Sequence, residues 1–177
     1  QVDLDVLEEF ERVARFALDP ENRWQPSPPE PGVAKGARAA ILVHPNNPTG
    51  SWIDPAAAER LAACAGVAPI PLIVDEVFLD FPLAPHVHAK TFAARSAGLT
   101  FTLGGLSKSR GLPQLKLSWI VVSGPDAEVA SALAALEFIG DSYLSVGTPI
   151  QEALPEILSR AAPVRDAILV RCVLNLA

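Results

Sequence analysis

The sequence predicts an α/β fold: a three-layer α/β/α domain with a mostly parallel sheet. Short apolar runs alternate along the chain with helical patterns, which is the order of βαβ units. The apolar runs are nearly continuous, as expected for strands that are covered on both faces. The chain has 177 residues and is 50% hydrophobic, which is enough for one domain with a sizeable core.

The order of elements follows from periodicity and from the residues that interrupt it. Residues 4–17 place apolar side chains at helical spacing and predict an amphipathic helix. Asp54 and Pro55 mark a helix start, since an N-cap is followed by proline at the first helical position. The strand candidates are 39–43, 71–81, 99–103 and 117–123. The further helices are expected at 55–65, 126–139, 149–160 and 164–177.

Composition narrows the class of function. The net charge of -6 and the pI near 5.0 argue against a nucleic-acid-binding protein, which usually has a basic face. No apolar run reaches the roughly 18 residues that a membrane span needs. The two cysteines form neither a disulfide framework nor a metal-binding cluster. We therefore expect a reduced, cytoplasmic protein that binds small molecules, with no bound metal, no nucleic acid and no membrane.

Three polar residues lie at the ends of predicted strands, where ligands bind in open α/β sheets. Asn47 precedes a proline in a tight turn, so its amide can donate a hydrogen bond in a fixed direction. Asp75 lies in an apolar run, where a carboxylate needs a positive partner. Lys108 is flanked by glycine and serine, so we expect partial desolvation and an amine that can attack an aldehyde. Taken singly, each residue also has an ordinary structural explanation.

Together these segments resemble a known family. HPNNPTG, then VDEVF, then GLSK, with 28 residues from Asn47 to Asp75 and 33 from Asp75 to Lys108, resemble the fold-type I pyridoxal 5′-phosphate (PLP) enzymes. The similarity is to the class I and II aminotransferases and extends over nearly the whole chain. It implies the large domain of a PLP-dependent transferase, which moves an amino group between an amino acid and a 2-oxo acid.

The resemblance also implies roles for the three residues. Lys108 would form the internal aldimine with PLP and would later move the proton between the substrate α-carbon and the cofactor. Asp75 would pair with the pyridine nitrogen, and Asn47 would hydrogen-bond the phenolic oxygen.

Other positions depart from the family's pattern. Phe78 stands where a tyrosine usually contacts the phenolic oxygen, so that hydrogen bond is absent and the aldimine pKa should be higher. Gly105 replaces a common serine of the phosphate site, although Ser107 can still donate. Lys116 replaces a common arginine, and lysine binds phosphate only as a point charge.

Three further residues have weaker expectations. Tyr143 lies in DSYLSVGTP, which resembles the segment that these homodimers bring near the neighbouring subunit's site. His44 is expected to pack in a loop, and Arg110 is expected to be a solvated arginine.

The resemblance implies a chain that is a piece of a longer protein. Residues 1–163 would be part of the PLP-binding large domain, and 164–177 would start the helix leading to a small C-terminal domain. Two alternatives stay open: a PLP-dependent lyase or decarboxylase on the same scaffold, and an inactive remnant. A phosphate-loop nucleotide site is disfavoured because Ser107, and not glycine, precedes the lysine.

Overall fold

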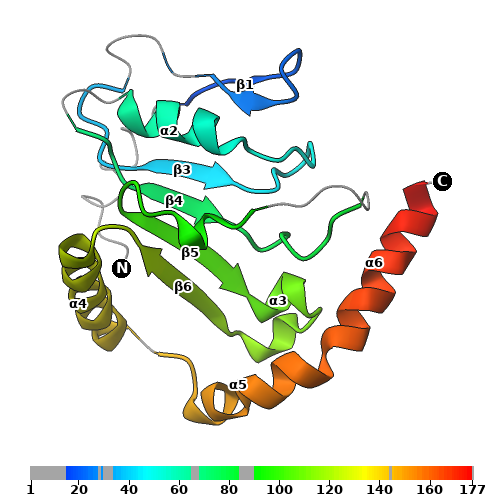
Figure 1. Cartoon of the computed structure of the whole chain (residues 1–177). Helices are drawn as coiled ribbons and strands as arrows, with labels where there is room; N and C mark the ends of the chain where they lie inside the picture. Colours follow the sequence, from blue (N-terminus) through cyan, green and yellow to red (C-terminus); the bar gives the residue numbers. More distant parts are fainter. Residues whose placement is uncertain are drawn as a thin grey trace, which may run out of the picture.

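A four-stranded sheet forms the centre of the fold (Figure 1). The computed structural model describes residues 15–27, 29, 34–64, 68–83, 90–143 and 145–176. The strands, in their spatial order, are β3 (Ala40–Val43), β4 (Leu72–Asp75), β5 (Thr100–Gly105) and β6 (Ser118–Ser123). The first three are parallel and β6 is antiparallel to β5, which confirms the predicted mostly parallel sheet.

The helices follow the predicted order. They are α2 (Pro55–Ala63), α3 (Leu106–Ser109), α4 (Asp126–Ser142), α5 (Thr148–Arg160) and α6 (Ala162–Leu176). Two short 3-10 turns, η1 (Phe92–Ala94) and η2 (Pro113–Leu115), and a small antiparallel pair, β1 (Leu18–Asp19) with β2 (Gln25–Pro26), complete the chain. The helix predicted at 4–17 lies almost entirely outside the described residues, and 15–17 are not helical. No helix in the described part of the chain could span a membrane.

The second strand is shorter than its apolar run predicts. The run 71–81 is a strand only as far as Asp75, and residues 77–80 form a turn. The Asp75 carboxylate accepts a hydrogen bond from the Val77 N–H at 3.0 Å, and the Leu79 N–H donates to the Glu76 carbonyl at 2.9 Å. These local bonds replace the sheet ladder, an alternative that periodicity does not reveal.

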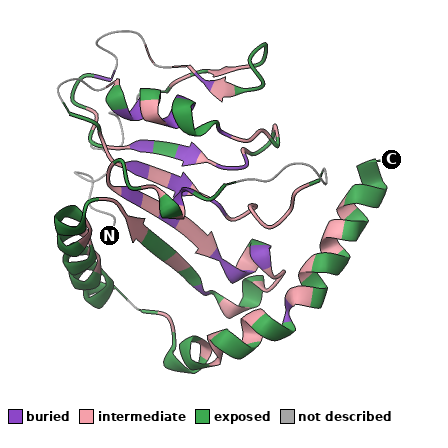
Figure 2. Ribbon diagram, in the orientation of Figure 1, coloured by how far each residue is buried: buried purple, intermediate pink, exposed green. Residues whose placement is uncertain are grey.

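The core lies between α2 and one face of the sheet, where the buried residues concentrate in Figure 2. Leu42, Leu72 and Val74 from the strands pack with Leu61 of α2, and each is at most 2% exposed. The helix starts as expected, because the Asp54 carboxylate caps the Ala56 N–H at 2.8 Å.

The opposite face of the sheet is less covered. Ile41 is 65% exposed and Ile120 is 46% exposed, although both lie on β-strands. None of the described residues of α4, α5 or α6 is buried. The expectation of strands covered on both faces therefore holds only on the α2 side, and there not for β6, where Val121 is 40% exposed.

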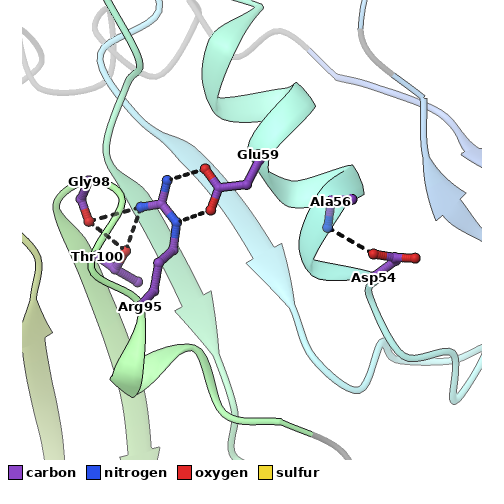
Figure 3. A network of polar contacts seen from close by, with 6 residues as sticks. All are labelled: Asp54, Ala56, Glu59, Arg95, Gly98 and Thr100. Atoms are coloured by element: carbon purple, nitrogen blue, oxygen red, sulfur yellow. Dashed lines mark hydrogen bonds and ion pairs between the residues drawn. The ribbon is translucent and has the colours of Figure 1, made fainter.

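An arginine joins three elements on the α2 side (Figure 3). The Arg95 guanidinium makes two bonds to the Glu59 carboxylate of α2, at 2.6 and 2.7 Å. Its Nη1 donates to the Gly98 carbonyl and to Thr100 Oγ1, both at 2.9 Å. The Arg95 side chain is only 6% exposed, and its hydrogen bond lowers the pKa of Glu59 below its ordinary value. The network ties α2 to the start of β5.

We predict that Arg95→Ala lowers the free energy of unfolding by about 2–3 kcal/mol, because several charge-assisted hydrogen bonds are lost at a nearly buried site. Urea denaturation followed by circular dichroism would measure the free energy of unfolding. The matched control is Arg160→Ala, which removes an ion pair with Glu156 whose side chains are 80% and 66% exposed. Because exposed pairs contribute little, equal losses in the two variants would contradict the prediction.

Candidate functional site

A cleft of about 760 Å³ lies beyond the carboxyl ends of β3, β4 and β5. One wall comes from the loops that follow these strands, and Ile168 and Cys172 of α6 line the other side. Figure 1 shows α6 standing across from the loops that follow β3 and β4. Parallel strands send their carboxyl ends to the same edge, so segments far apart in the sequence converge there. The cleft brings together four of the predicted site residues: Asn47, Phe78, Ser107 and Lys108.

The loop after β3 presents Asn47 from a tight turn. The turn is closed by bonds from the Gly50 N–H to the Asn46 carbonyl and from the Asn46 N–H to the Ser51 carbonyl, each 2.8 Å. Asn46 Nδ2 also donates to Thr49 Oγ1 at 2.8 Å, and Gly50 takes the positive φ of 67° that glycine tolerates. These contacts leave Asn47 exposed at the rim of the cleft, where its amide can reach a ligand.

Lys108 projects from the short helix α3. Its Nζ lies 5.9 Å from the centre of the Phe78 ring, within the range of a cation–π contact. Ser109 Oγ donates to the Gly105 carbonyl at 2.7 Å and anchors α3 to the end of β5. Lys108 is an exposed residue, so the predicted partial desolvation is wrong for this structure. The reason is its position on a four-residue helix at the open end of the sheet.

Two other predicted site residues lie outside the cleft lining. The Asp75 side chain is half-buried and accepts a hydrogen bond from the Val77 N–H. Lys116 is exposed and adopts a left-handed backbone with φ of 52° at the end of η2. Tyr143, which is 76% exposed, is also absent from the lining. The structure therefore brings the segments of Asn47, Phe78 and Lys108 together, but not the whole predicted set.

His44 has a structural position, as its sequence context predicts. It is 2% exposed, and its Nδ1 accepts a hydrogen bond from the Ile53 N–H at 3.0 Å. Its ring packs edge-on against Trp52 and Phe92, with centroid distances of 5.3 and 5.0 Å. Burial lowers the pKa of the imidazole below its ordinary value of 6.5. His44 thus holds the loop between β3 and α2 in place from the core side, and it does not line the cleft.

Glu76 faces away from the cleft. Its carboxylate accepts hydrogen bonds from Thr91 Oγ1 and from the Phe92 N–H, both at 2.6 Å. Burial raises the pKa of this carboxyl above its ordinary value of 4.5, against the effect of those two bonds.

Sequence reasoning missed the apolar part of the lining. It includes Trp52, Phe81 and Leu83 from the loops, and Ile168 and Cys172 from α6. Ile168 and Cys172 are four residues apart and share one helix face, so the pattern indicated a common direction. No pattern indicated which loop they meet. Gly111 permits the approach, since a Cβ there would come within 2.9 Å of Ile168 Cδ1.

The lining offers an amine, two side-chain amides and a hydroxyl in a mostly apolar cleft. Such a site can hold a flat, partly apolar molecule and direct a nucleophilic nitrogen at one of its atoms. Among the described residues, no group of three His, Cys, Asp or Glu side chains could hold a metal ion.

Comparisons with known proteins identify the family of the chain. Residues 12–169 match the family model for aminotransferase class I and II. The chain is 22% identical over 160 residues to a glutamate-pyruvate aminotransferase of Haemophilus influenzae, covering 89% of this chain and 40% of that protein. It is 31% identical over 155 residues to an S-alkyl-thiohydroximate lyase of Arabidopsis thaliana, covering 84% and 33%.

A solved structure shows the same fold. The tyrosine aminotransferase from Leishmania infantum gives a TM-score of 0.69 at 21% identity and covers 81% of this chain and 36% of that one. The chain therefore resembles the fold-type I aminotransferases while it spans between 33% and 40% of the length of these relatives.

We predict that His44 makes stability fall as the pH drops below 6.5. Its folded-state pKa is lowered, so the unfolded chain binds the proton more tightly, and stability is lost as the pH falls from 6.5 toward the folded-state pKa. His44→Asn keeps an acceptor for the Ile53 N–H but does not titrate. The free energy of unfolding, measured by urea denaturation from pH 7 to pH 5, should fall less steeply in this variant. Glu76 titrates in both proteins, so equal slopes would contradict the prediction.

Proposed function

The chain belongs to the class I and II aminotransferase family, and on that basis we propose that it carries the lysine-bearing part of the PLP site of an aminotransferase. The reaction would move an amino group between an amino acid and a 2-oxo acid. The proposal concerns the activity of the whole protein, because the chain covers about two fifths or less of its relatives. The observation that carries it is the convergence of Asn47, Phe78, Ser107 and Lys108 on one cleft.

The residues of the cleft fit the cofactor. PLP is a flat ring with an aldehyde, a phenolic oxygen and a phosphate. The Lys108 amine suits the aldehyde, the Asn47 amide suits the phenolic oxygen, and the Ser107 hydroxyl suits a phosphate oxygen. A volume of about 760 Å³ lies within the usual range for small-molecule sites, which is roughly 300–1,000 Å³. Phe78 and Phe81 offer the apolar surface that a ring needs.

PLP, when bound, supplies an electron sink that stabilises negative charge at the α-carbon of an amino acid. Lys108 Nζ would hold the cofactor through its aldehyde carbon and, as a free amine, would move the proton at the substrate α-carbon. Asn47 would orient the ring through its phenolic oxygen. Phe78 and Phe81 would exclude water from the side of the cleft that follows β4.

Asp75 and Lys116 remain part of the proposal, as partners of the ring nitrogen and of the phosphate. Asp75 Oδ1 already binds the Val77 N–H, which leaves its second oxygen for a cationic ring nitrogen. Lys116 follows η2 and would have to turn from solvent toward the cleft. Of these two positions, the phosphate side is therefore the less completely formed.

The larger organisation is proposed on the same basis. We assign residues 1–163 to part of the PLP-binding domain and 164–177 to the start of a helix toward a small domain. The exposed Tyr143 agrees with a role at a homodimer interface, where it would approach the partner's site. Support for these assignments comes from the family match over residues 12–169.

A lyase on the same scaffold is the second candidate. The observation that keeps it open is the 31% identity to a plant S-alkyl-thiohydroximate lyase, next to 30% identity over the same number of residues to a probable aminotransferase of Arabidopsis thaliana. The cofactor-contacting residues are shared, so reaction type depends on substrate contacts.

We predict that PLP, followed by borohydride reduction, labels Lys108 in preference to the other lysines. The chain has four lysines, so peptide mapping by mass spectrometry can compare Lys108 directly with Lys35, Lys90 and Lys116. We expect Lys108 to carry at least about tenfold more label than any of the other three lysines, because it is the lysine that lines the cleft. Lys108→Arg is the control and should remove the excess while keeping the charge. Even labelling of all four lysines would overturn the proposed role of Lys108.

We also predict 2-oxo acid formation when the natural protein containing this chain is given PLP, an amino acid and a second 2-oxo acid. Amino-group transfer should convert the acceptor 2-oxo acid into its amino acid, and chromatography would follow both products. Release of ammonia, or loss of carbon dioxide without amination of the acceptor, would instead support the lyase or decarboxylase alternative. If Lys108 labels but no amino acid is consumed, the chain is a cofactor-binding remnant.

A further inference from the structure

The cleft wall that carries Phe78 and the wall that carries Lys108 come from different strands. The loop 76–81 follows β4, and α3 follows β5. Since β4 and β5 are parallel neighbours, both segments leave the sheet at the same edge. Strand pairing brings them near each other, but it does not fix their separation beyond the last paired residues.

Apart from one ion pair, the hydrogen bonds of 77–81 and 106–111 lie within each segment or join it to other parts of the fold. In the loop, the Phe81 N–H donates to the Phe78 carbonyl at 3.1 Å. Around α3, the Arg110 N–H donates to the Leu106 carbonyl at 3.2 Å, and Ser109 Oγ reaches back to β5. These bonds shape each segment, but none of them runs from 77–81 to 106–111.

One ion pair crosses between them. Arg110 Nη1 lies 2.6 Å from Asp80 Oδ2, and it also donates to the Ser109 carbonyl at 2.8 Å. Within the described residues, no other hydrogen bond or ion pair joins 77–81 to 106–111. The side chains are only 17% exposed for Arg110 and 36% for Asp80, so the expectation of a solvated arginine was wrong.

The ion pair lies close to the two residues that face each other across the cleft, Lys108 and Phe78. Arg110 is two residues after Lys108, and Asp80 is two residues after Phe78. The Lys108 ammonium and the Phe78 ring are the groups that meet across the gap, at 5.9 Å. Arg110 Nε is buried without a hydrogen-bond partner among the described residues. Because an unpaired buried donor is costly, the arrangement is poorly explained as a stabilising contact alone.

We propose that Asp80 and Arg110 are positioning residues, whose ion pair holds α3 against the loop 76–81 and thereby sets Lys108 opposite Phe78. The effect of this ion pair on activity rests on the proposed function, in which Lys108 holds the cofactor. Neither Asp80 nor Arg110 is part of the cleft lining, so their effect on a ligand would be indirect.

The test uses the 177-residue chain with Asp80→Asn, with Arg110→Gln and with the reversed pair Asp80→Arg/Arg110→Asp. The first readout needs no cofactor: amide hydrogen exchange by mass spectrometry over 77–81 and 106–111. Either single variant should speed exchange in both segments by roughly tenfold, as expected for the loss of a charge-assisted bond, and the reversed pair should restore it. Exchange in α2 should not change. Glu156→Gln, which breaks an exposed pair elsewhere, is the matched control.

The second readout is the share of borohydride-fixed PLP at Lys108 among the four lysines. The single variants should lower that share several-fold, and the reversed pair should recover it, which a purely structural role would not predict. Unchanged exchange in both single variants, faster exchange throughout the chain, or no recovery in the reversed pair would each overturn the proposal. If the parent chain itself does not label at Lys108, the proposed function fails, while the exchange readout still decides on the ion pair.

Discussion

The parallel pairing of β3, β4 and β5 is the constraint on which the rest of this structure depends. Pairing aligns Val43 with Asp75 and Asp75 with Leu103, so the three strands stop at one edge. Each loop that follows then adds its residue to a common cleft. The asparagine, phenylalanine and lysine are separated by tens of residues in the chain, and only this register makes them neighbours. A change of register in any one strand would remove its loop from the site.

Local polar contacts then set the detail at that edge. The Asn46–Thr49–Ser51 turn presents Asn47, the buried His44 supports the loop from the core, and Ser109 fixes α3 to the end of β5. Most of these contacts join residues close in sequence, so they form with little loss of chain entropy. The contacts of Arg95 with Glu59 and of Arg110 with Asp80 are different, because they join residues 36 and 30 positions apart. They link the elements that the short contacts cannot reach.

Two departures from the family pattern, Phe78 and Gly105, have identifiable surroundings in the structure. Phe78 gives an apolar ring where a hydroxyl is usual, and the centre of that ring lies 5.9 Å from Lys108 Nζ. Gly105 is buried, and a Cβ there would come within 3.2 Å of Ser118 Cβ and 3.3 Å of the Leu117 carbonyl, so the strand pairing itself leaves little room for a serine.

The sequence alone determined the fold class and the order of most elements, and it placed Asn47 and Lys108 just after two strands, because periodicity, caps and turn residues act over a few neighbouring positions. It overextended the second strand, since the Asp75-to-Val77 bond that ends it is invisible to an apolar pattern. Only the tertiary structure decided that α6 lines one side of the cleft, that Lys108 is exposed and that Arg110 is paired with Asp80. Those outcomes depend on long-range packing, in which the partner of a side chain is set by the arrangement of elements and not by its neighbours along the chain.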